Sequence, residues 1–295
     1  DIKLVKFLAH ILPKRIVRSI VSRLVLPSSL FPTNRKHPLS KEYNDYYQRH
    51  GVKSQPFKTE GISGTLLKKG NPTQDTPTYI FACPNAATQN DLKHNTMVSD
   101  LFNQLDHVNV ILFDYPGVGH SQGDPLPEQA IAAGQHMYRY AQHKLNTSAE
   151  NIRLVGWSYG TFVMTRVAER VAHTGKMLLY QGSDSLIDAV ITKEPRLQNI
   201  ANRVLTDCGY QIFNNTELLK NLKCETHIVI TTNDKVFPVF SNTLMPSDKL
   251  KFVKIESDLK STHMQPLSCF KQESLLLFEP HCAQPLARPD GCRSF

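Results

Sequence analysis

The sequence predicts an α/β fold with a mostly parallel central sheet and helices on both of its faces. Short apolar runs typical of buried strands occur at 78–82, 108–113, 152–155, 177–180, 228–232 and 250–255. Stretches with helical periodicity lie between them at 97–105, 128–145 and 161–173. Strands that alternate with helices form parallel sheets. The chemistry of such a sheet gathers at the carboxyl ends of its strands.

Three further segments complete the expected fold. Alternating residues at 52–68, interrupted by Gly61 and Gly64, predict a leading hairpin. Gly175 follows the 161–173 helix and is expected to form its C-terminal cap. Between the strand that ends at Tyr180 and the next one there is room for a small helical cap, at about 182–225.

The basic charge of the chain is concentrated at its amino-terminal end. The net charge is +8, and residues 1–60 hold 12 Lys/Arg against 4 Asp/Glu, whereas residues 61–295 hold 22 of each. A basic end on a neutral body indicates a basic arm and argues against a nucleic-acid-binding core. The six cysteines have no metal-ligand spacing, although Cys282 and Cys292 could pair locally, so we expect no metal and no cofactor.

Two amphipathic segments form this arm. Residues 3–12 and 14–25 each combine an apolar stripe with basic residues, and Pro13 separates them. One interpretation is a pair of helices that lie in a membrane interface, with peripheral membrane contact through residues 1–26. The other is that the stripes pack on the body of the protein. The expected division is an arm at 1–36, an α/β domain at 37–278 and a tail at 279–295.

A candidate nucleophile lies where an apolar strand meets a helix. The 152–155 run leads directly into Gly156-Trp157-Ser158-Tyr159-Gly160. In a strand–turn–helix context, Gly-x-Ser-x-Gly places the serine on a strained turn, with glycines where a side chain would collide with its neighbours. We therefore expect Ser158 to be a nucleophile, and the alternative is a structural turn serine.

A serine nucleophile needs a base, and the base needs a carboxylate that orients it. In this type of fold the chain order is serine, acid, histidine. Asp234 directly follows the 228–232 strand and is the expected acid, with Asp184 and Asp188 as rivals. His263 follows the last strand and is the expected base. His281, in the Pro-rich tail, and His120, which precedes the serine, are the rival histidines.

The oxyanion of an acyl-transfer intermediate needs two backbone donors. One is expected from the amide of Tyr159, directly after the nucleophile. The other should come from the loop that follows the 78–82 strand. Pro84 has no amide hydrogen, so Asn85 is the expected donor, with Ala86 as the alternative.

These motifs resemble those of the α/β-hydrolase superfamily, and within it the ABHD-type membrane-associated acyl hydrolases. Residues 114–121 read Asp-Tyr-Pro-Gly-Val-Gly-His-Ser and are similar to the Asp-Tyr-x-Gly-x-Gly-x-Ser turn of that group. Residues 148–160 resemble its nucleophile block, and residues 232–236 its acid block. The resemblance covers about 60–278. It implies the α/β-hydrolase fold and a catalytic triad, and the expected substrates are acyl lipids or acylated proteins.

The chain departs from the group at the oxyanion loop and in the arm. The group usually has His-Gly-Asn-Ala where this chain has Cys-Pro-Asn-Ala at 83–86, which keeps Asn85 but alters the loop. The cysteine-rich acylated leader of membrane-bound relatives is missing from residues 1–60. The divergent sequence also resembles lipase-like effectors of intracellular bacteria, which implies a protein delivered into a host cell.

The expected function is that of a serine hydrolase that cleaves carboxylic esters near membranes through an acyl-enzyme. Two alternatives from other classes remain. One is a binding module of the same fold whose altered oxyanion loop no longer supports catalysis. The other is a membrane or partner anchor formed by the arm. Within the enzyme class, a thioesterase or a peptidase remains open.

Overall fold

The computed structural model describes residues 13–25, 40–85, 87–93, 95–193, 198–231 and 247–255. Within these ranges, eight strands form one sheet in the order β1-β2-β4-β3-β5-β6-β7-β8. The strands are β1 (Val52–Thr59), β2 (Ile62–Lys69), β3 (Thr78–Ala82), β4 (Val108–Phe113), β5 (Ile152–Trp157), β6 (Lys176–Tyr180), β7 (Glu225–Thr231) and β8 (Leu250–Ile255). The pairs β1–β2 and β2–β4 are antiparallel, and all other pairs are parallel.

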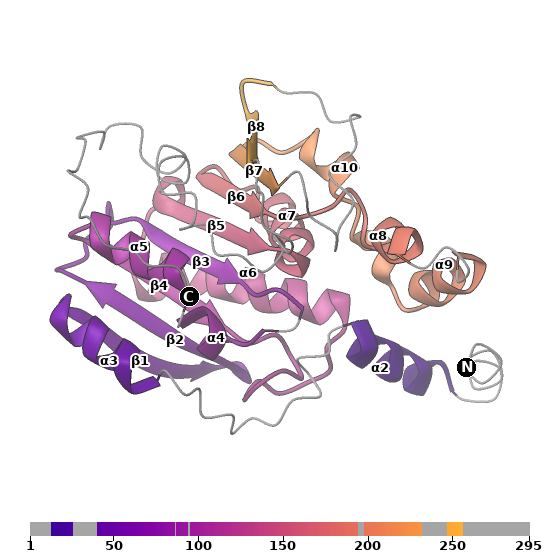
Figure 1. Ribbon diagram of the computed structural model, residues 1–295, viewed down its shortest axis with the longest axis horizontal. Coiled ribbons are helices and arrows are strands. Elements are labelled where there is room, and N and C mark those ends of the chain that lie inside the picture. The colour runs from indigo at the N-terminus through magenta and orange to yellow at the C-terminus, as the bar shows by residue number, and fades with distance from the viewer. Residues whose placement is uncertain are drawn as a thin grey trace.

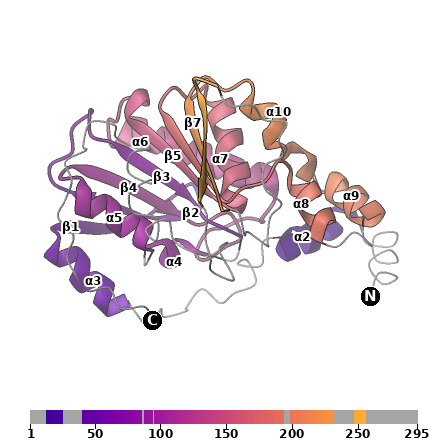
Figure 2. The ribbon, with the colours of Figure 1, turned by 45° about the horizontal axis from the view of Figure 1, so that its top comes forward.

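Helices cover both faces of this sheet (Figure 1). The described helices are α2 (Lys14–Val25), α3 (Ser40–Arg49), α4 (Gln89–Lys93), α5 (Thr96–Gln104), α6 (Pro127–Lys144), α7 (Tyr159–Arg170), α8 (Leu186–Lys193), α9 (Gln198–Asp207) and α10 (Asn215–Leu219). Figure 2 shows α6 and α7 on one face and α4 and α5 on the other. The chain therefore has the predicted α/β architecture with a covered, mostly parallel sheet.

The central strands are buried on both sides. Every residue of β3, β4 and β5 is buried, whereas β1 at the edge of the sheet is mostly exposed. Strands covered on both faces need continuous apolar runs, because no side of the strand faces water. The strands and helices predicted from these runs are confirmed, with ends that agree within a few residues.

The predicted role of Gly175 is wrong. Helix α7 ends at Arg170, and the residue with left-handed backbone beyond it is Ala172, with φ 48°. The amide of His173 donates to the carbonyl of Ala168 across this turn at 2.9 Å. A Cβ at Gly175 would lie 2.2 Å from the carbonyl oxygen of Ile152, so glycine is required there for close approach to the start of β5.

Helices α8, α9 and α10 fill the connection between β6 and β7, where a cap of helices was expected. Figure 1 shows α8 and α9 beyond the carboxyl ends of the parallel strands, with α2 beside them. Helix α2 was predicted and is present, and it contacts α9. The first segment of the arm, 3–12, lies outside the described residues.

Candidate active site

Ser158 occupies a strained turn between β5 and α7. Its backbone has φ 54° and ψ −115°, a conformation that residues with a side chain rarely adopt. The turn is secured on both sides: the Ser158 amide donates to the carbonyl of Tyr180 at 2.8 Å, and the Thr161 hydroxyl donates to the Ser158 carbonyl at 2.6 Å. Such strain persists only where surrounding contacts impose it, and it marks functional positions.

The two glycines of the motif are sterically required, as predicted. A Cβ at Gly156 would lie 2.5 Å from the carbonyl oxygen of Gly160. A Cβ at Gly160 would lie 2.2 Å from the carbonyl oxygen of Ala82, at the end of β3. The Ser158 turn therefore packs directly against the end of β3. The loop that begins at Cys83 starts beside Ser158.

The loop after β3 is held by the strand next to it. The Tyr115 hydroxyl donates to the Cys83 carbonyl at 2.7 Å, and the Cys83 thiol donates to the Phe113 carbonyl at 3.6 Å. Burial raises the pKa of the Cys83 thiol well above its usual value, so this cysteine stays protonated and is a packing residue. Asn85, the expected oxyanion donor, is half-buried in this loop. Ala86, the alternative donor, lies outside the described residues.

A pair of buried polar residues, Gln89 and Asp114, are hydrogen-bonded to each other at the far end of this loop. The Gln89 amide donates to Asp114 Oδ1 at 2.8 Å, and its side-chain Nε2 donates to Asp114 Oδ2 at 2.9 Å. Burial raises the pKa of Asp114, and the hydrogen bonds from Gln89 oppose that rise. Asp114 directly follows β4, so the pair ties the segment from Asn85 to the start of α4 to the neighbouring strand.

Sequence reasoning did not single out Gln89. Asp114 belongs to the Asp-Tyr-x-Gly-x-Gly-x-Ser turn, and a Cβ at Gly119 of that turn would lie 2.3 Å from its carboxylate. The partner of Asp114, by contrast, is 25 residues away in the chain and carries no local signal.

The side chain of Tyr159 connects the Ser158 turn to the β6–β7 connection. Its ring is fully buried and meets the rings of Tyr115 and Phe213 edge to face, with centroids 5.6 and 5.5 Å apart. Burial raises its pKa well above the usual value for tyrosine. Phe213 comes from the segment between α9 and α10. The Asn215 side chain next to it donates to the Ser183 carbonyl at 2.9 Å, close to the end of β6.

The end of β6 carries a second strained residue. Gln181 has φ 52°, and its side chain accepts a hydrogen bond from the Trp157 indole nitrogen at 3.0 Å. Its amide donates to the Val229 carbonyl of β7 at 2.9 Å. These contacts join the strand that precedes Ser158 to the strand that leads toward the expected acid.

The expected acid and base, Asp234 and His263, lie outside the described residues. The structure shows the strands that lead to them: β7 ends at Thr231 and β8 at Ile255, on the side of β5 where β6 also lies. Both strands run parallel to β5, so their carboxyl ends lie at the same edge as Ser158.

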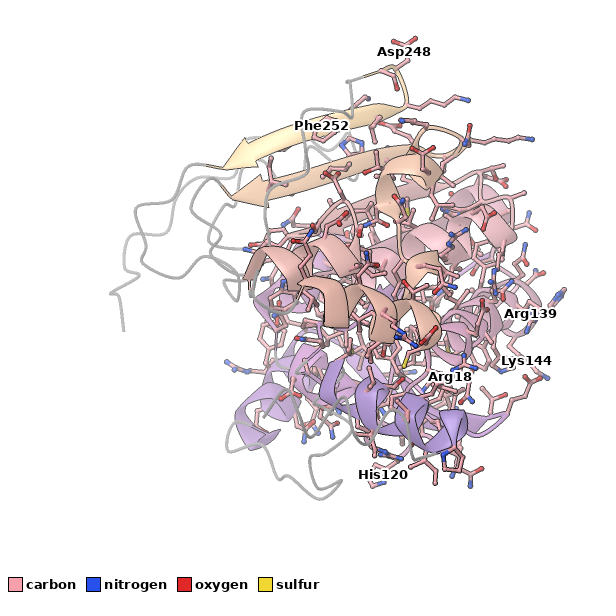
Figure 3. The ribbon with its side chains drawn as sticks, turned by 90° about the vertical axis from the view of Figure 1, so that its right-hand side faces the viewer. Arg18, His120, Arg139, Lys144, Asp248 and Phe252 are labelled. Carbon is pink, nitrogen blue, oxygen red and sulfur yellow. The ribbon has the colours of Figure 1, made fainter. Side chains whose placement is uncertain are left out.

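Three of the alternative acids and histidines, Asp184, Asp188 and His120, lie within the described residues. The Asp184 carbonyl accepts the Asn215 amide at 2.6 Å, and Asp188 lies in the first turn of α8. His120 is exposed, and Figure 3 shows it below α2, which fits a loop histidine. His281 lies beyond the described residues. Within the described ranges, no group of three or more His, Cys, Asp or Glu side chains is arranged to hold a metal ion.

The strand order and the strained serine between β5 and α7 define an α/β-hydrolase fold. The chain belongs to the family described as Chlamydia CHLPS protein (DUF818), whose sequence model matches residues 88–250, more than half of the chain. That match contains the Ser158 turn and the Asp114 turn.

Curated relatives are more distant. The chain is 27% identical over 176 residues to the protein YfhR of Salmonella typhimurium, which covers 57% of this chain and 58% of the relative. It is 24% identical over 186 residues to the protein bem46 of Schizosaccharomyces pombe, which covers 62% and 60%. The chain thus spans about 60% of the length of these relatives.

Solved structures agree on the fold. An alpha-beta hydrolase from Vibrio vulnificus superposes with a TM-score of 0.60 at 14% identity, covering 87% of this chain and 90% of the other. An esterase from Pyrococcus furiosus superposes with a TM-score of 0.53 at 13% identity, covering 75% and 86%. At these identities the likeness establishes the fold, and the reaction has to be argued from the site.

Proposed function

We propose that this chain is a serine hydrolase that cleaves carboxylic esters through an acyl-enzyme, with acyl lipids or acylated compounds as substrates. The observation that carries the proposal is the strained backbone of Ser158, with φ 54°, at the carboxyl end of a central parallel strand. A turn of this shape raises the hydroxyl above the sheet edge, where a substrate can reach it.

In the proposed mechanism, Ser158 Oγ attacks the acyl carbonyl carbon while His263 takes the hydroxyl proton. Asp234 orients His263 and stabilises its protonated form. The amides of Tyr159 and Asn85 stabilise the oxyanion of the tetrahedral intermediate. The intermediate expels the alcohol, which takes the proton from His263. A water molecule, activated by the same histidine, then releases the acid and restores Ser158.

Two features of the site support this scheme. Helix α7 begins at Tyr159, directly after Ser158, so the positive end of the helix lies next to the proposed nucleophile. The packing of Gly160 against Ala82 brings the start of the loop with Asn85 beside that helix end, as a two-donor oxyanion hole requires.

The experiment that tests the proposal is covalent labelling with a fluorophosphonate probe. We expect the native chain to be labelled and Ser158→Ala to be silent, while Ser54→Ala, an exposed serine on β1, behaves like the native chain. Circular dichroism shows whether Ser158→Ala is folded. A folded native chain that resists labelling would contradict the proposal. It would favour the binding-module alternative, in which the Cys83-Pro84 loop does not form an oxyanion hole.

The same assay assigns the triad. Asp234→Asn and His263→Gln should each slow labelling by about a thousandfold or more, because either change leaves the serine without a competent base. Asp184→Asn and His120→Gln should label at close to the native rate. Loss of labelling in one of these rivals, with Asp234 or His263 dispensable, would overturn the assignment.

A further inference from the structure

Helix α2 buries only part of its apolar stripe: Val21 and Val25 pack against the hydrophobic core. Ile16 and Ile20, four residues apart on one side of the helix, remain 44% and 45% exposed. Among the described residues, they are the large apolar side chains that stay exposed to this degree. Ser22, about 200° around the helix from Ile20, is completely buried. The amino-terminal half of the stripe, with both isoleucines, is therefore left uncovered by the body of the protein.

Polar contacts hold α2 in this orientation together with the packing of Val21 and Val25. Ser22 lies against Tyr210 in the segment before α10, and Arg18 Nη2 lies beside Gly209, 3.4 Å from the position of a Cβ there. Arg23 pairs with Asp124 at 3.6 Å, on the loop that follows β4. These contacts fix α2 on both sides. They hold the helix in an orientation that leaves its two isoleucines exposed.

The exposed face lies at the same end of the molecule as the nucleophile turn. Figure 3 looks onto this end and shows α2 between the helices of the β6–β7 connection and the loop with His120. A continuous chain of ring contacts links α2 to the Ser158 turn. Tyr210, which α2 touches, packs on Phe213 with ring centroids 6.1 Å apart, and Phe213 packs on Tyr159, the neighbour of Ser158. A surface that binds through α2 would therefore lie next to the carboxyl edge of the sheet.

The charge of α2 identifies the kind of surface. Its sequence, KRIVRSIVSRLV, holds four basic residues and no acidic one, and of these Arg23 already pairs with Asp124 of the body. Basic residues beside a short apolar stripe match a bilayer with anionic headgroups, where each basic residue near the surface adds about 1 kcal/mol. A second copy of this chain fits less well. Two isoleucines cannot supply the roughly 1,000 Å² that a stable dimer buries, and the basic helices would repel each other.

We propose that α2 docks on anionic lipid bilayers by inserting Ile16 and Ile20 into the interface, which presents the carboxyl edge of the sheet to the membrane. The identity of the substrate as a membrane lipid rests on the proposed function, whereas the docking does not. The helix acts as a fixed anchor on the folded body and lies in the interface plane.

Vesicle co-sedimentation of the full chain tests the docking. We expect binding to vesicles of phosphatidylcholine with 30% phosphatidylserine, little binding to pure phosphatidylcholine, and weaker binding as salt increases. Ile16→Ser with Ile20→Ser should lower the partition coefficient by about tenfold or more. Lys53→Gln with Lys58→Gln, which removes two exposed charges from β1, should change it less than twofold.

The outcomes separate docking from catalysis. The isoleucine variant should keep fluorophosphonate labelling and hydrolysis of a short soluble ester, and Ser158→Ala should bind vesicles like the native chain. Unchanged vesicle binding in the isoleucine variant would overturn the proposal, and so would an equal loss in the β1 control. A dimer in solution that the isoleucine changes dissociate would assign this face to a second copy. Labelling that fails while vesicle binding persists would count against the proposed function alone.

Discussion

Replacing Gln89 by alanine tests whether the Gln89–Asp114 pair positions the loop that carries Asn85. The side chain is buried and makes three hydrogen bonds: Nε2 donates to Asp114 Oδ2 at 2.9 Å and to Ser63 Oγ at 3.1 Å, and Oε1 accepts from the Thr65 hydroxyl at 2.9 Å. Alanine removes all three and leaves the Asp114 carboxylate with one donor fewer in a buried site.

The magnitude follows from these bonds. A hydrogen bond between neutral groups contributes about 1 kcal/mol and one to a carboxylate about 1.5–3 kcal/mol. Gln89→Ala should therefore lower the free energy of unfolding by about 3–5 kcal/mol. If the loop shifts by about 1 Å, kcat for a soluble ester should fall roughly tenfold to a hundredfold with little change in KM, because the oxyanion donor acts in the transition state.

The conservative variant Gln89→Glu adds a signature in pH. It places two carboxylates within hydrogen-bond distance in a buried site, where both cannot be ionised at once. Stability and kcat should therefore be low at pH 7.5 and recover relative to the native chain near pH 5, where one proton can be shared. Gln55→Ala, an exposed glutamine on β1, serves as the control that should change neither quantity.

Urea unfolding and ester hydrolysis, both measured at the two pH values, provide the comparison. A free energy of unfolding for Gln89→Ala within about 1 kcal/mol of the native value would show that these hydrogen bonds do not stabilise the fold. A large loss of stability with native kcat in the folded fraction would make the pair structural only and would refute its positioning role. Gln89→Glu without any pH dependence would also contradict the assigned geometry.

Three further changes test other parts of the structure. Burial lowers the pKa of His173 from 6.5 to about 4. Between these pH values the unfolded chain binds more protons than the folded chain. The free energy of unfolding should therefore fall by about 2 kcal/mol from pH 8 to pH 5. His173→Gln should remove this part of the pH dependence in urea unfolding, and an unchanged slope would contradict it. Gly160→Ala should cost several kcal/mol and abolish labelling, because its Cβ would meet the Ala82 carbonyl at 2.2 Å; a melting temperature within 2 °C of native would rule this out. Phe213→Ala should lower the free energy of unfolding by about 3–5 kcal/mol and Phe213→Leu by about 1 kcal/mol. Equal losses for the two variants in thermal unfolding would show that the ring contacts of Phe213 are unimportant.

The sequence by itself determined the elements and the strained turn at Ser158. Both depend on residues that are close together in the chain. Buried strands need continuous apolar runs, and a strand that turns sharply into a helix needs Gly156 and Gly160 on either side of Ser158. The same local logic predicted the strands that lead to Asp234 and His263. Those two residues lie outside the described ranges, so their roles remain predictions.

Only the tertiary structure decided what these elements contact. The partner of Asp114 is Gln89, which comes from another loop, and Gly175 is required by the approach of β5 rather than by the end of its helix. The amphipathic pattern of α2 allowed packing on the body or on a membrane, and the fold turned Ser22 inward and left Ile16 and Ile20 exposed. The physical reason is common to all three. Periodicity and turn chemistry act between neighbours in the chain, whereas steric contact and buried hydrogen bonds depend on which segments the sheet brings together.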